Sequence, residues 1–129
     1  DIGGLLSGDL AAVYDDILGV VGAARPVPVK VILETSMLTD EQKAIACLVA
    51  ARTGAAYVKT STGFGGGGAT VEDIALMRHM VGDRLGVKAS GAVRNHRDAE
   101  KVLHAGADRI GASASIAIIG GGDAGAGGY

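Results

Sequence analysis

Three lysines follow a valine in apolar segments of the chain, at Lys30, Lys59 and Lys88. From Lys30 to Lys59, and again from Lys59 to Lys88, the interval is 29 residues. This equal spacing predicts one repeated strand-helix unit with the lysines at equivalent strand positions. Because side chains alternate along a strand, the valines then point to one face of the sheet and the lysines to the other.

Neighbouring strands of a parallel sheet lie about 4.8 Å apart, so Lys88 is expected beside Lys59. Repulsion between two ammonium groups, together with desolvation, lowers the pKa of one of them and leaves a neutral amine near pH 7. A neutral amine adds to a carbonyl carbon and forms an imine, which acts as an electron sink for cleavage of a C–C bond. In the structural alternative, Lys59 reaches to solvent or pairs with Glu34.

Glycine and serine follow the last two predicted strands, in the segments Ser90–Val93 and Gly111–Ser115. Glycine lets backbone N–H groups approach an anion, Ser113 and Ser115 add hydroxyl donors, and a short helix at 116–119 adds a favourable dipole. Barrel enzymes commonly build a phosphate site from the loops after strands 7 and 8. The pattern therefore predicts a phosphate site, and two ordinary tight turns are the alternative.

Apolar β-branched runs alternate with helical patterns along the chain, which is typical of strand-helix-strand units and a parallel sheet. We expect strands at Val27–Leu33, Ala56–Ser61, Gly86–Ala89 and Asp108–Gly111, and helices at Asp9–Gly22, Asp40–Arg52, Val71–Leu85 and Asn95–His104. Thr39 and Thr70 have the sequence context of N-caps, and Gly54 and Gly106 follow two of the helices where a left-handed residue ends the last turn.

The three lysines also decide between two parallel architectures. In an open doubly wound sheet, helices cover both faces, and burial of three cations beneath helices is costly. In a (β/α)8 barrel the lysine face is the interior, where lysines meet a ligand. We therefore expect a half TIM barrel at residues 1–119, because four units are half of a barrel of roughly 250 residues. The residues at 120–129 have few apolar side chains and predict a flexible Gly-rich tail.

Composition excludes several classes of function. With 12 basic and 14 acidic residues the net charge is −2, which favours neither nucleic acid nor an anionic membrane as partner. A single cysteine, Cys47, fits a reducing compartment, and we expect a cytoplasmic protein. The three histidines, His79, His96 and His104, lack metal-ligand spacing, so no metal is expected. The tract at Gly63–Gly68 matches G-x-G-x-x-G, but no acidic residue follows on the next strand, so NAD binding is not expected.

Four segments of the chain resemble the deoxyribose-phosphate aldolase family in order and spacing: VKVILET at 29–35, YVKTSTGF at 57–64, GVKASGAVR at 86–94 and GADRIGAS at 106–113. The resemblance implies a TIM barrel that cleaves 2-deoxy-D-ribose 5-phosphate to D-glyceraldehyde 3-phosphate and acetaldehyde, without a cofactor. It also implies that Lys59 is the Schiff-base lysine and that Lys88 is the second lysine that tunes it. The positions that match the family's substrate-phosphate site are Gly63, Gly91, Ala92, Gly111 and Ser113.

The chain departs from the family at three points. Ala92 replaces a usual glycine, and the resemblance covers only the C-terminal half, from the end of the fourth strand at Asp1–Gly3 onward. The family's catalytic aspartate lies upstream of Asp1 and its role is not carried over. A half barrel has two open strand edges, which favours a homodimer that pairs the Lys30 strand of each copy with the Ile110 strand of the other. A catalytically inactive half barrel that self-associates is the alternative to an active aldolase.

Overall fold

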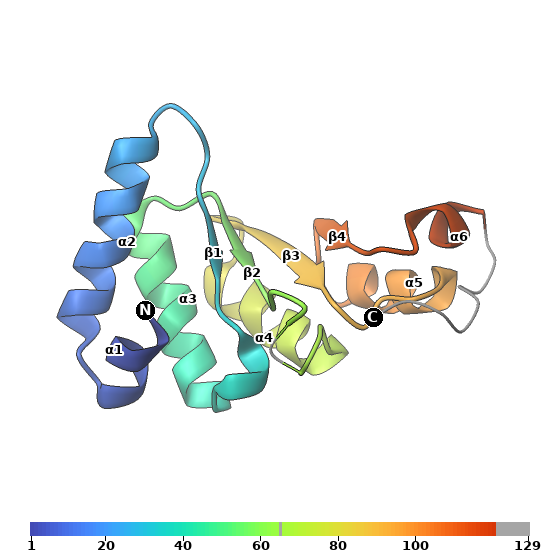
Figure 1. Ribbon diagram of the computed structural model, residues 1–129, viewed down its shortest axis with the longest axis horizontal. Coiled ribbons are helices and arrows are strands. Elements are labelled where there is room, and N and C mark those ends of the chain that lie inside the picture. The colour runs from blue at the N-terminus through green and yellow to red at the C-terminus, as the bar shows by residue number, and fades with distance from the viewer. Residues whose placement is uncertain (65, 121–129) are drawn as a thin grey trace.

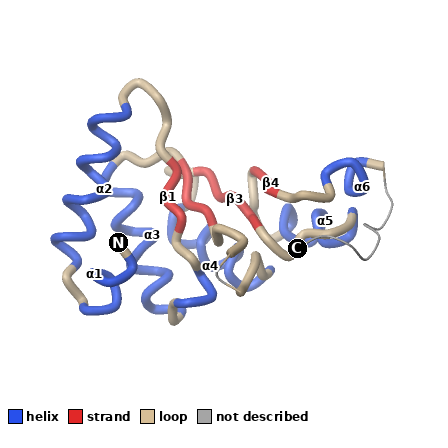
Figure 2. The backbone as a smooth tube through the Cα atoms, viewed as in Figure 1, coloured by secondary structure: helices blue, strands red, loops and turns tan. Residues whose placement is uncertain are grey.

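The structure is a computed structural model that describes residues 1–64 and 66–120. Its centre is a parallel sheet of four strands in the order β1-β2-β3-β4, and helices alternate with the strands along the chain (Figures 1 and 2). The strands are β1 (Lys30–Ile32), β2 (Tyr57–Lys59), β3 (Gly86–Ser90) and β4 (Arg109–Gly111). The helices are α1 (Ile2–Ser7), α2 (Leu10–Ala24), the 3-10 helix η1 (Thr35–Met37), α3 (Asp40–Thr53), α4 (Val71–Val81), α5 (His96–His104) and α6 (Ser115–Ile119).

The sheet has one covered face and one open face. Val58, Val87 and Ala89 are completely buried and belong to the same core as Ile74 and Met77 of α4. Figure 1 shows the helices in the order of the strands, from α2 and α3 beside β1 to α5 and α6 beside β4. The valines that precede the lysines therefore lie in the helix layer, as the alternation predicts.

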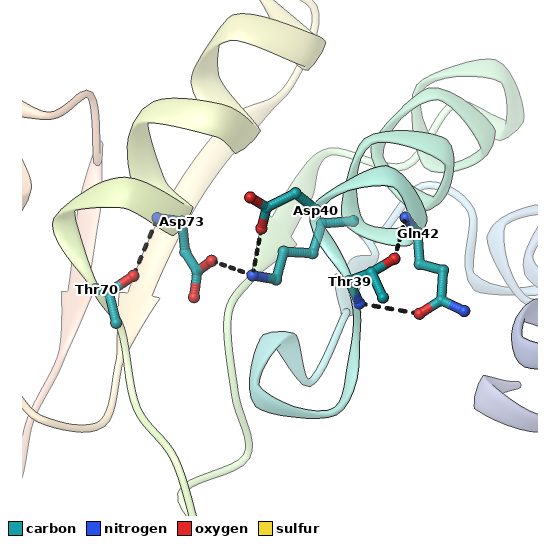
Figure 3. Close-up of polar contacts among 6 residues, drawn as sticks. Thr39, Asp40, Gln42, Thr70 and Asp73 are labelled. Carbon is teal, nitrogen blue, oxygen red and sulfur yellow. Dashed lines mark hydrogen bonds and ion pairs between the residues drawn. The ribbon is translucent and has the colours of Figure 1, made fainter.

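Local capping signals define where the helices begin. The Thr39 hydroxyl accepts the Gln42 N–H at 3.2 Å and the Gln42 side chain accepts the Thr39 N–H at 2.9 Å, which completes a capping box at the start of α3 (Figure 3). Thr70 caps α4 through the Asp73 N–H at 3.0 Å. Both N-cap predictions are confirmed.

An ion pair joins the starts of α3 and α4. The ammonium of Lys43 contacts Asp73 at 2.6 Å and Asp40 at 2.9 Å (Figure 3). Burial alone would lower the pKa of Lys43, but hydrogen bonds to Asp73 and Asp40 outweigh it and raise that pKa. The pair fixes the beginning of α4, and therefore the end of the loop that leaves β2, against α3.

Several predicted boundaries differ from the structure. The family resemblance predicts the end of a strand at Asp1–Gly3, and this is wrong: Asp1 is the N-cap of α1, and its carboxylate accepts the Gly4 N–H at 2.9 Å. Helix α4 ends at Val81 rather than Leu85, because Gly82 has a φ of 54° and breaks the helical path. Strand β1 begins at Lys30 rather than Val27, since Pro28 has no N–H to give to a ladder.

The predicted tail falls at the limit of the described chain. Gly120 ends α6, and the tail predicted at 120–129 otherwise lies outside the described residues. In the described ranges no helix is long and apolar enough to cross a membrane. Within the same ranges no group of three or more His, Cys, Asp or Glu side chains is arranged to hold a metal ion.

Candidate active site

Lys59 and Lys88 are direct partners in the sheet. The register of β2 and β3 pairs them Cα to Cα, and the alternation of each strand puts both side chains on the open face. Both side chains are half-buried. The structure therefore brings together the two lysines that the sequence singles out for imine chemistry.

Lys30 does not occupy the equivalent position in its strand. The equal 29-residue spacing predicts Lys30 level with Lys59, but β1 pairs Lys30 with Tyr57 and Ile32 with Lys59. The two-residue offset keeps Lys30 on the same face and moves it toward the amino-terminal end of the sheet. Staggered register of this kind is inherent in sheets that curve toward a barrel, so sequence spacing alone does not fix the level of a residue.

The pKa of Lys88 is lowered. Burial is the largest cause, followed by the positive charges of Lys30, Lys59 and Arg109. The sequence predicts a lowered pKa for one of the two paired lysines, and in the structure this lysine is Lys88. Sequence reasoning missed Arg109, which pairs with Lys88 across β3 and β4. The sequence did offer a signal for Arg109, because this residue lies in a predicted strand, two residues before Gly111.

Two glycines make room for these cations on the open face. A Cβ atom at Gly86 would lie 2.1 Å from the Tyr57 ring, so the ring lies across β3 where no side chain stands. The Arg109 guanidinium stacks over that ring, 4.3 Å from its centroid. A Cβ at Gly111 would lie 3.0 Å from the Lys88 Cε, so Lys88 extends over β4 at Gly111.

Glu34 has a partner other than Lys59. Its carboxylate accepts the Thr62 hydroxyl at 2.6 Å and the Thr62 N–H at 3.1 Å, and no ion pair links it to Lys59 among the described residues. Glu34 is buried and has a φ of 59°, an unusual conformation for a residue with a side chain. The carboxylate therefore anchors the loop that follows Lys59.

Buried hydroxyls tie the end of β2 to the end of β3. The Thr60 hydroxyl donates to the Ser90 carbonyl at 3.0 Å and accepts the Ser90 N–H at 3.0 Å. The Ser61 hydroxyl also donates to the Ser90 carbonyl, at 3.0 Å. Because Thr60 follows Lys59 and Ser90 lies two residues after Lys88, these bonds fix the relative position of the two lysines.

The predicted phosphate residues all lie at the carboxyl-terminal side of the sheet. Gly63 follows β2, Gly91 and Ala92 follow β3, Gly111 ends β4 and Ser113 is exposed just after it. Gly63, Gly91 and Ala92 have positive φ values of 95°, 74° and 61°.

The loops after β2 and β3 contact each other closely. The Ala69 N–H donates to the Ser90 carbonyl at 3.0 Å, and a Cβ at Gly68 would lie 2.7 Å from the Ala92 Cβ. The sequence predicts the Ser115 hydroxyl as a donor to the phosphate. In the structure this hydroxyl donates to the Ala112 carbonyl instead, at 2.9 Å. Arg94 is exposed at the start of the segment that leads to α5.

A cleft of about 250 Å³ lies elsewhere, between the start of α4 and α5. Its lining residues are Ala69, Thr70, Val71, Glu72, Ala92, Val93, Asp98, Lys101 and Val102. Neither Lys59 nor Lys88 contributes to it. The paired lysines therefore lie on an open face of the sheet rather than in an enclosed pocket.

Four parallel strands in sequential order, alternating with helices and carrying ionisable side chains on an open inner face, make up half of a (β/α)8 barrel of the aldolase type. No family model matches the chain. By sequence and by structure the chain is a homologue of the deoxyribose-phosphate aldolases over about half of their length, consistent with the C-terminal half. The resemblance and the half-barrel prediction are both confirmed.

The deoxyribose-phosphate aldolase of Rhodospirillum rubrum is 58% identical over 124 residues, which cover 96% of this chain and 52% of the relative. A crystal structure of a deoxyribose-phosphate aldolase from Coccidioides immitis, described as putative in its name, matches with a TM-score of 0.88 and 41% identity, over 92% of this chain and 48% of that one. The tetrameric deoxyribose phosphate aldolase of Aeropyrum pernix matches with a TM-score of 0.80 and 34% identity, over 86% and 49%. The chain thus spans about half the length of the proteins it matches.

Proposed function

We propose that this chain carries the imine-forming site of a class I aldolase that acts on 2-deoxy-D-ribose 5-phosphate. The observation that supports the proposal is the register pair of Lys59 and Lys88 on the open face, with the pKa of Lys88 lowered by burial and by neighbouring cations. A lysine beside a second lysine of lowered pKa can pass on its proton and attack as a neutral amine.

In the proposed reaction the Lys59 amine adds to C1 of the open-chain sugar, and loss of water gives a protonated imine. The imine withdraws the electron pair of the C2–C3 bond as that bond breaks, and the C3 hydroxyl loses its proton to give D-glyceraldehyde 3-phosphate. The remaining enamine takes a proton at C2, and water then releases acetaldehyde and the free lysine. Lys88 is the proposed proton acceptor during imine formation.

The proposed phosphate-binding residues are Gly63, Gly91, Ala92, Gly111 and Ser113. Their position at or beyond the carboxyl-terminal ends of β2, β3 and β4 supports this assignment, since barrel enzymes bind ligands at that end. No cofactor is needed, because the imine itself supplies the electron sink. The sugar phosphate is the proposed substrate.

Borohydride trapping with acetaldehyde, followed by peptide mass spectrometry, tests the imine. We expect one ethyl group on Lys59, lost in Lys59→Met and kept in the matched control Lys101→Met, which removes an exposed lysine of α5. An ethyl group on Lys88 alone would exchange the roles of the two lysines. No adduct on either lysine would remove imine chemistry altogether.

A catalytically inactive half barrel is the second candidate, and the exposure of the lysine face favours it. Lys30 and Arg109 are exposed, so this face lacks the dry enclosure that strengthens electrostatic catalysis. Turnover assays with deoxyribose 5-phosphate separate the candidates. An adduct on Lys59 without release of glyceraldehyde 3-phosphate indicates the inactive half barrel.

We also propose that two copies associate through their sheet edges. In the described part of the chain β1 pairs only with β2 and β4 only with β3, so each sheet has two open edges. Large apolar side chains are also exposed, including Ile32 on the edge strand β1 and Ile116 of α6. Light scattering after size exclusion should give twice the chain mass, and a folded monomer at micromolar concentration contradicts the dimer.

A further inference from the structure

The open face of the sheet concentrates positive charge that forms no ion pair within the part of the chain that the structure describes. Lys30, Lys59, Lys88 and Arg109, one from each strand, form what we call the cation cluster. The ion pairs within residues 1–64 and 66–120 involve other cations. The clustering contrasts with the net charge of −2 of the whole chain.

Packing rather than ion pairing sets the direction of two of these cations. The Arg109 side chain from β4 lies over the Tyr57 ring of β2, which crosses β3 at Gly86. Lys88 extends over Gly111 at the other end of β4. Both cations are therefore oriented in advance of any ligand, which reduces the entropy lost when they bind one.

Lys30 approaches the same region from the opposite edge. The register places it beside Tyr57, whose ring the Arg109 guanidinium covers. The positive charge of Lys30 is also one of the causes that lower the pKa of Lys88. In the register Lys30 pairs with Tyr57 and Lys88 pairs with Arg109, so donors from β1, β3 and β4 lie on one face of the sheet. Among the described residues none of these three cations forms an ion pair with a carboxylate.

We propose that the cation cluster binds a phosphate-class dianion between Lys30, Lys88 and Arg109. A guanidinium offers two parallel N–H donors that fit two phosphate oxygens, and each ammonium adds a compact positive charge. A dianion compensates the mutual repulsion of the cluster more fully than a monovalent ion of low hydrogen-bonding capacity. The two sites meet at Gly111, where the Lys88 side chain lies over β4. The other residues proposed for the substrate phosphate lie in loops outside the cation cluster: Gly63, Gly91, Ala92 and Ser113.

The proposal has a consequence for reactivity, and this step alone rests on the proposed function. A bound dianion offsets the charges that lower the pKa of Lys88 and so raises that pKa toward its ordinary value. Inorganic phosphate then slows imine formation at Lys59 without occupying the loop site.

Titration of the ¹⁵N-labelled chain with inorganic phosphate tests the site, with chloride at matched ionic strength as the reference. The side-chain Nε–H of Arg109 reports the cation cluster, and the backbone N–H of Ser113 reports the loops. We expect a saturable shift at Arg109 Nε–H with phosphate and not with chloride. The affinity from that shift should fall about tenfold in Lys30→Gln, because one charge-assisted hydrogen bond is lost.

Two further variants keep the test decisive. Lys30→Arg restores the charge and should restore the affinity, whereas Arg97→Gln removes an exposed cation of α5 and should change the affinity less than about twofold. An equal loss of phosphate affinity in Lys30→Gln and Arg97→Gln would show that the effect is general electrostatic screening, and it would overturn the proposal. NMR shifts confined to the Ser113 N–H would also overturn the proposal. An Arg109 Nε–H shift that depends on protein concentration rather than on phosphate would overturn it too, since a second copy of the chain would then occupy the face.

Because the titration reports binding and not chemistry, its result is independent of the trapping experiment. A phosphate response at Arg109 in a chain that forms no adduct on Lys59 supports the anion site and rejects the aldolase proposal. An adduct without a phosphate response does the reverse.

Discussion

Lys59 and Lys88 are paired Cα to Cα across β2 and β3, with both side chains on the open face. Two ammonium groups in this arrangement repel each other, and Lys30 and Arg109 add to the repulsion at Lys88. This repulsion lowers the stability of the fold, and it also makes the Lys88 amine lose its proton more readily. A measurable link between pH and stability follows from it.

Lys88→Met is expected to stabilise the protein at pH 7. The unfolded chain holds the Lys88 proton up to the ordinary pKa of 10.5, whereas the folded chain releases it at a lower pH. The unfolded state therefore binds more protons between the two pKa values, and stability rises with pH across that window. Below the window the charged lysine imposes its full penalty, which the methionine removes. Urea unfolding at pH 7 should give a higher midpoint for the variant, and the difference should shrink toward pH 10.5.

The matched control for that comparison is Lys101→Met, which removes an exposed lysine of α5 outside the cation cluster. Its midpoint should differ little from that of the parent at either pH. A Lys88→Met midpoint at or below the parent's at pH 7 contradicts a repulsive cluster.

Lys43→Met should destabilise the protein by about 3 kcal/mol, because it leaves the Asp73 carboxylate without its cation. Both side chains of this pair are largely buried, at 12% and 10% exposure, which distinguishes it from a surface ion pair. Asp40, which also contacts Lys43, is 84% exposed, so Asp40→Asn should cost less than about 1 kcal/mol. Urea unfolding of the two variants at pH 7 makes the comparison. Equal losses would show that burial of the Asp73 contact has no energetic consequence.

The pH dependence of this pair has the opposite sign to that of Lys88. The pKa of Lys43 is raised in the folded state, so its stabilisation is complete below the ordinary value of 10.5 and is lost as the pH rises through the folded pKa. The stability difference between the parent and Lys43→Met should therefore narrow at strongly alkaline pH.

Ala92→Gly should stabilise the protein by about 0.5–1 kcal/mol. Ala92 has a φ of 61°, where a Cβ atom costs roughly 1–2 kcal/mol, and glycine avoids most of that cost despite its greater entropy when unfolded. Ala75→Gly, at an exposed position inside α4, is the matched control and should destabilise by about 1 kcal/mol. The denaturation midpoints of the two variants should move in opposite directions. If the midpoints of both variants moved to a lower denaturant concentration, the backbone at Ala92 would not be strained.

The local features of this fold are the ones that the sequence predicts well. The alternation around Lys59 and Lys88 predicts their common face, and Thr39 and Thr70 predict the starts of α3 and α4. These features depend on side-chain periodicity and on hydrogen bonds between residues that are three positions apart in the chain. The helical pattern after Thr70 continues to Leu85, yet the backbone turns at Gly82.

Features that depend on how strands are offset could not be predicted in this way. The level of Lys30 follows from the stagger of β1 against β2, which the curvature of the whole sheet determines. The place of Arg109 over Tyr57 requires Gly86 from a third strand, so no segment of the sequence contains the interaction. The partner of Glu34 is likewise a loop residue rather than the lysine that charge complementarity suggests.

Glu34→Gln should destabilise the protein by about 2 kcal/mol, since the 2.6 Å bond from the Thr62 hydroxyl to a carboxylate is charge-assisted. In the structure Oε2 of Glu34 accepts both Thr62 donors, and Oε1 accepts a longer bond from the Thr62 N–H at 3.3 Å. Glutamine keeps one oxygen for these donors but loses the negative charge and the second oxygen. Thr62→Val removes the hydroxyl and keeps the N–H, so the double variant isolates the hydroxyl contact. We expect a coupling energy of about 1 kcal/mol or more from unfolding of the four proteins. Strictly additive losses would mean that the loop after Lys59 is held by other contacts, and Glu41→Gln, at an exposed carboxylate of α3, should cost less than about 0.5 kcal/mol.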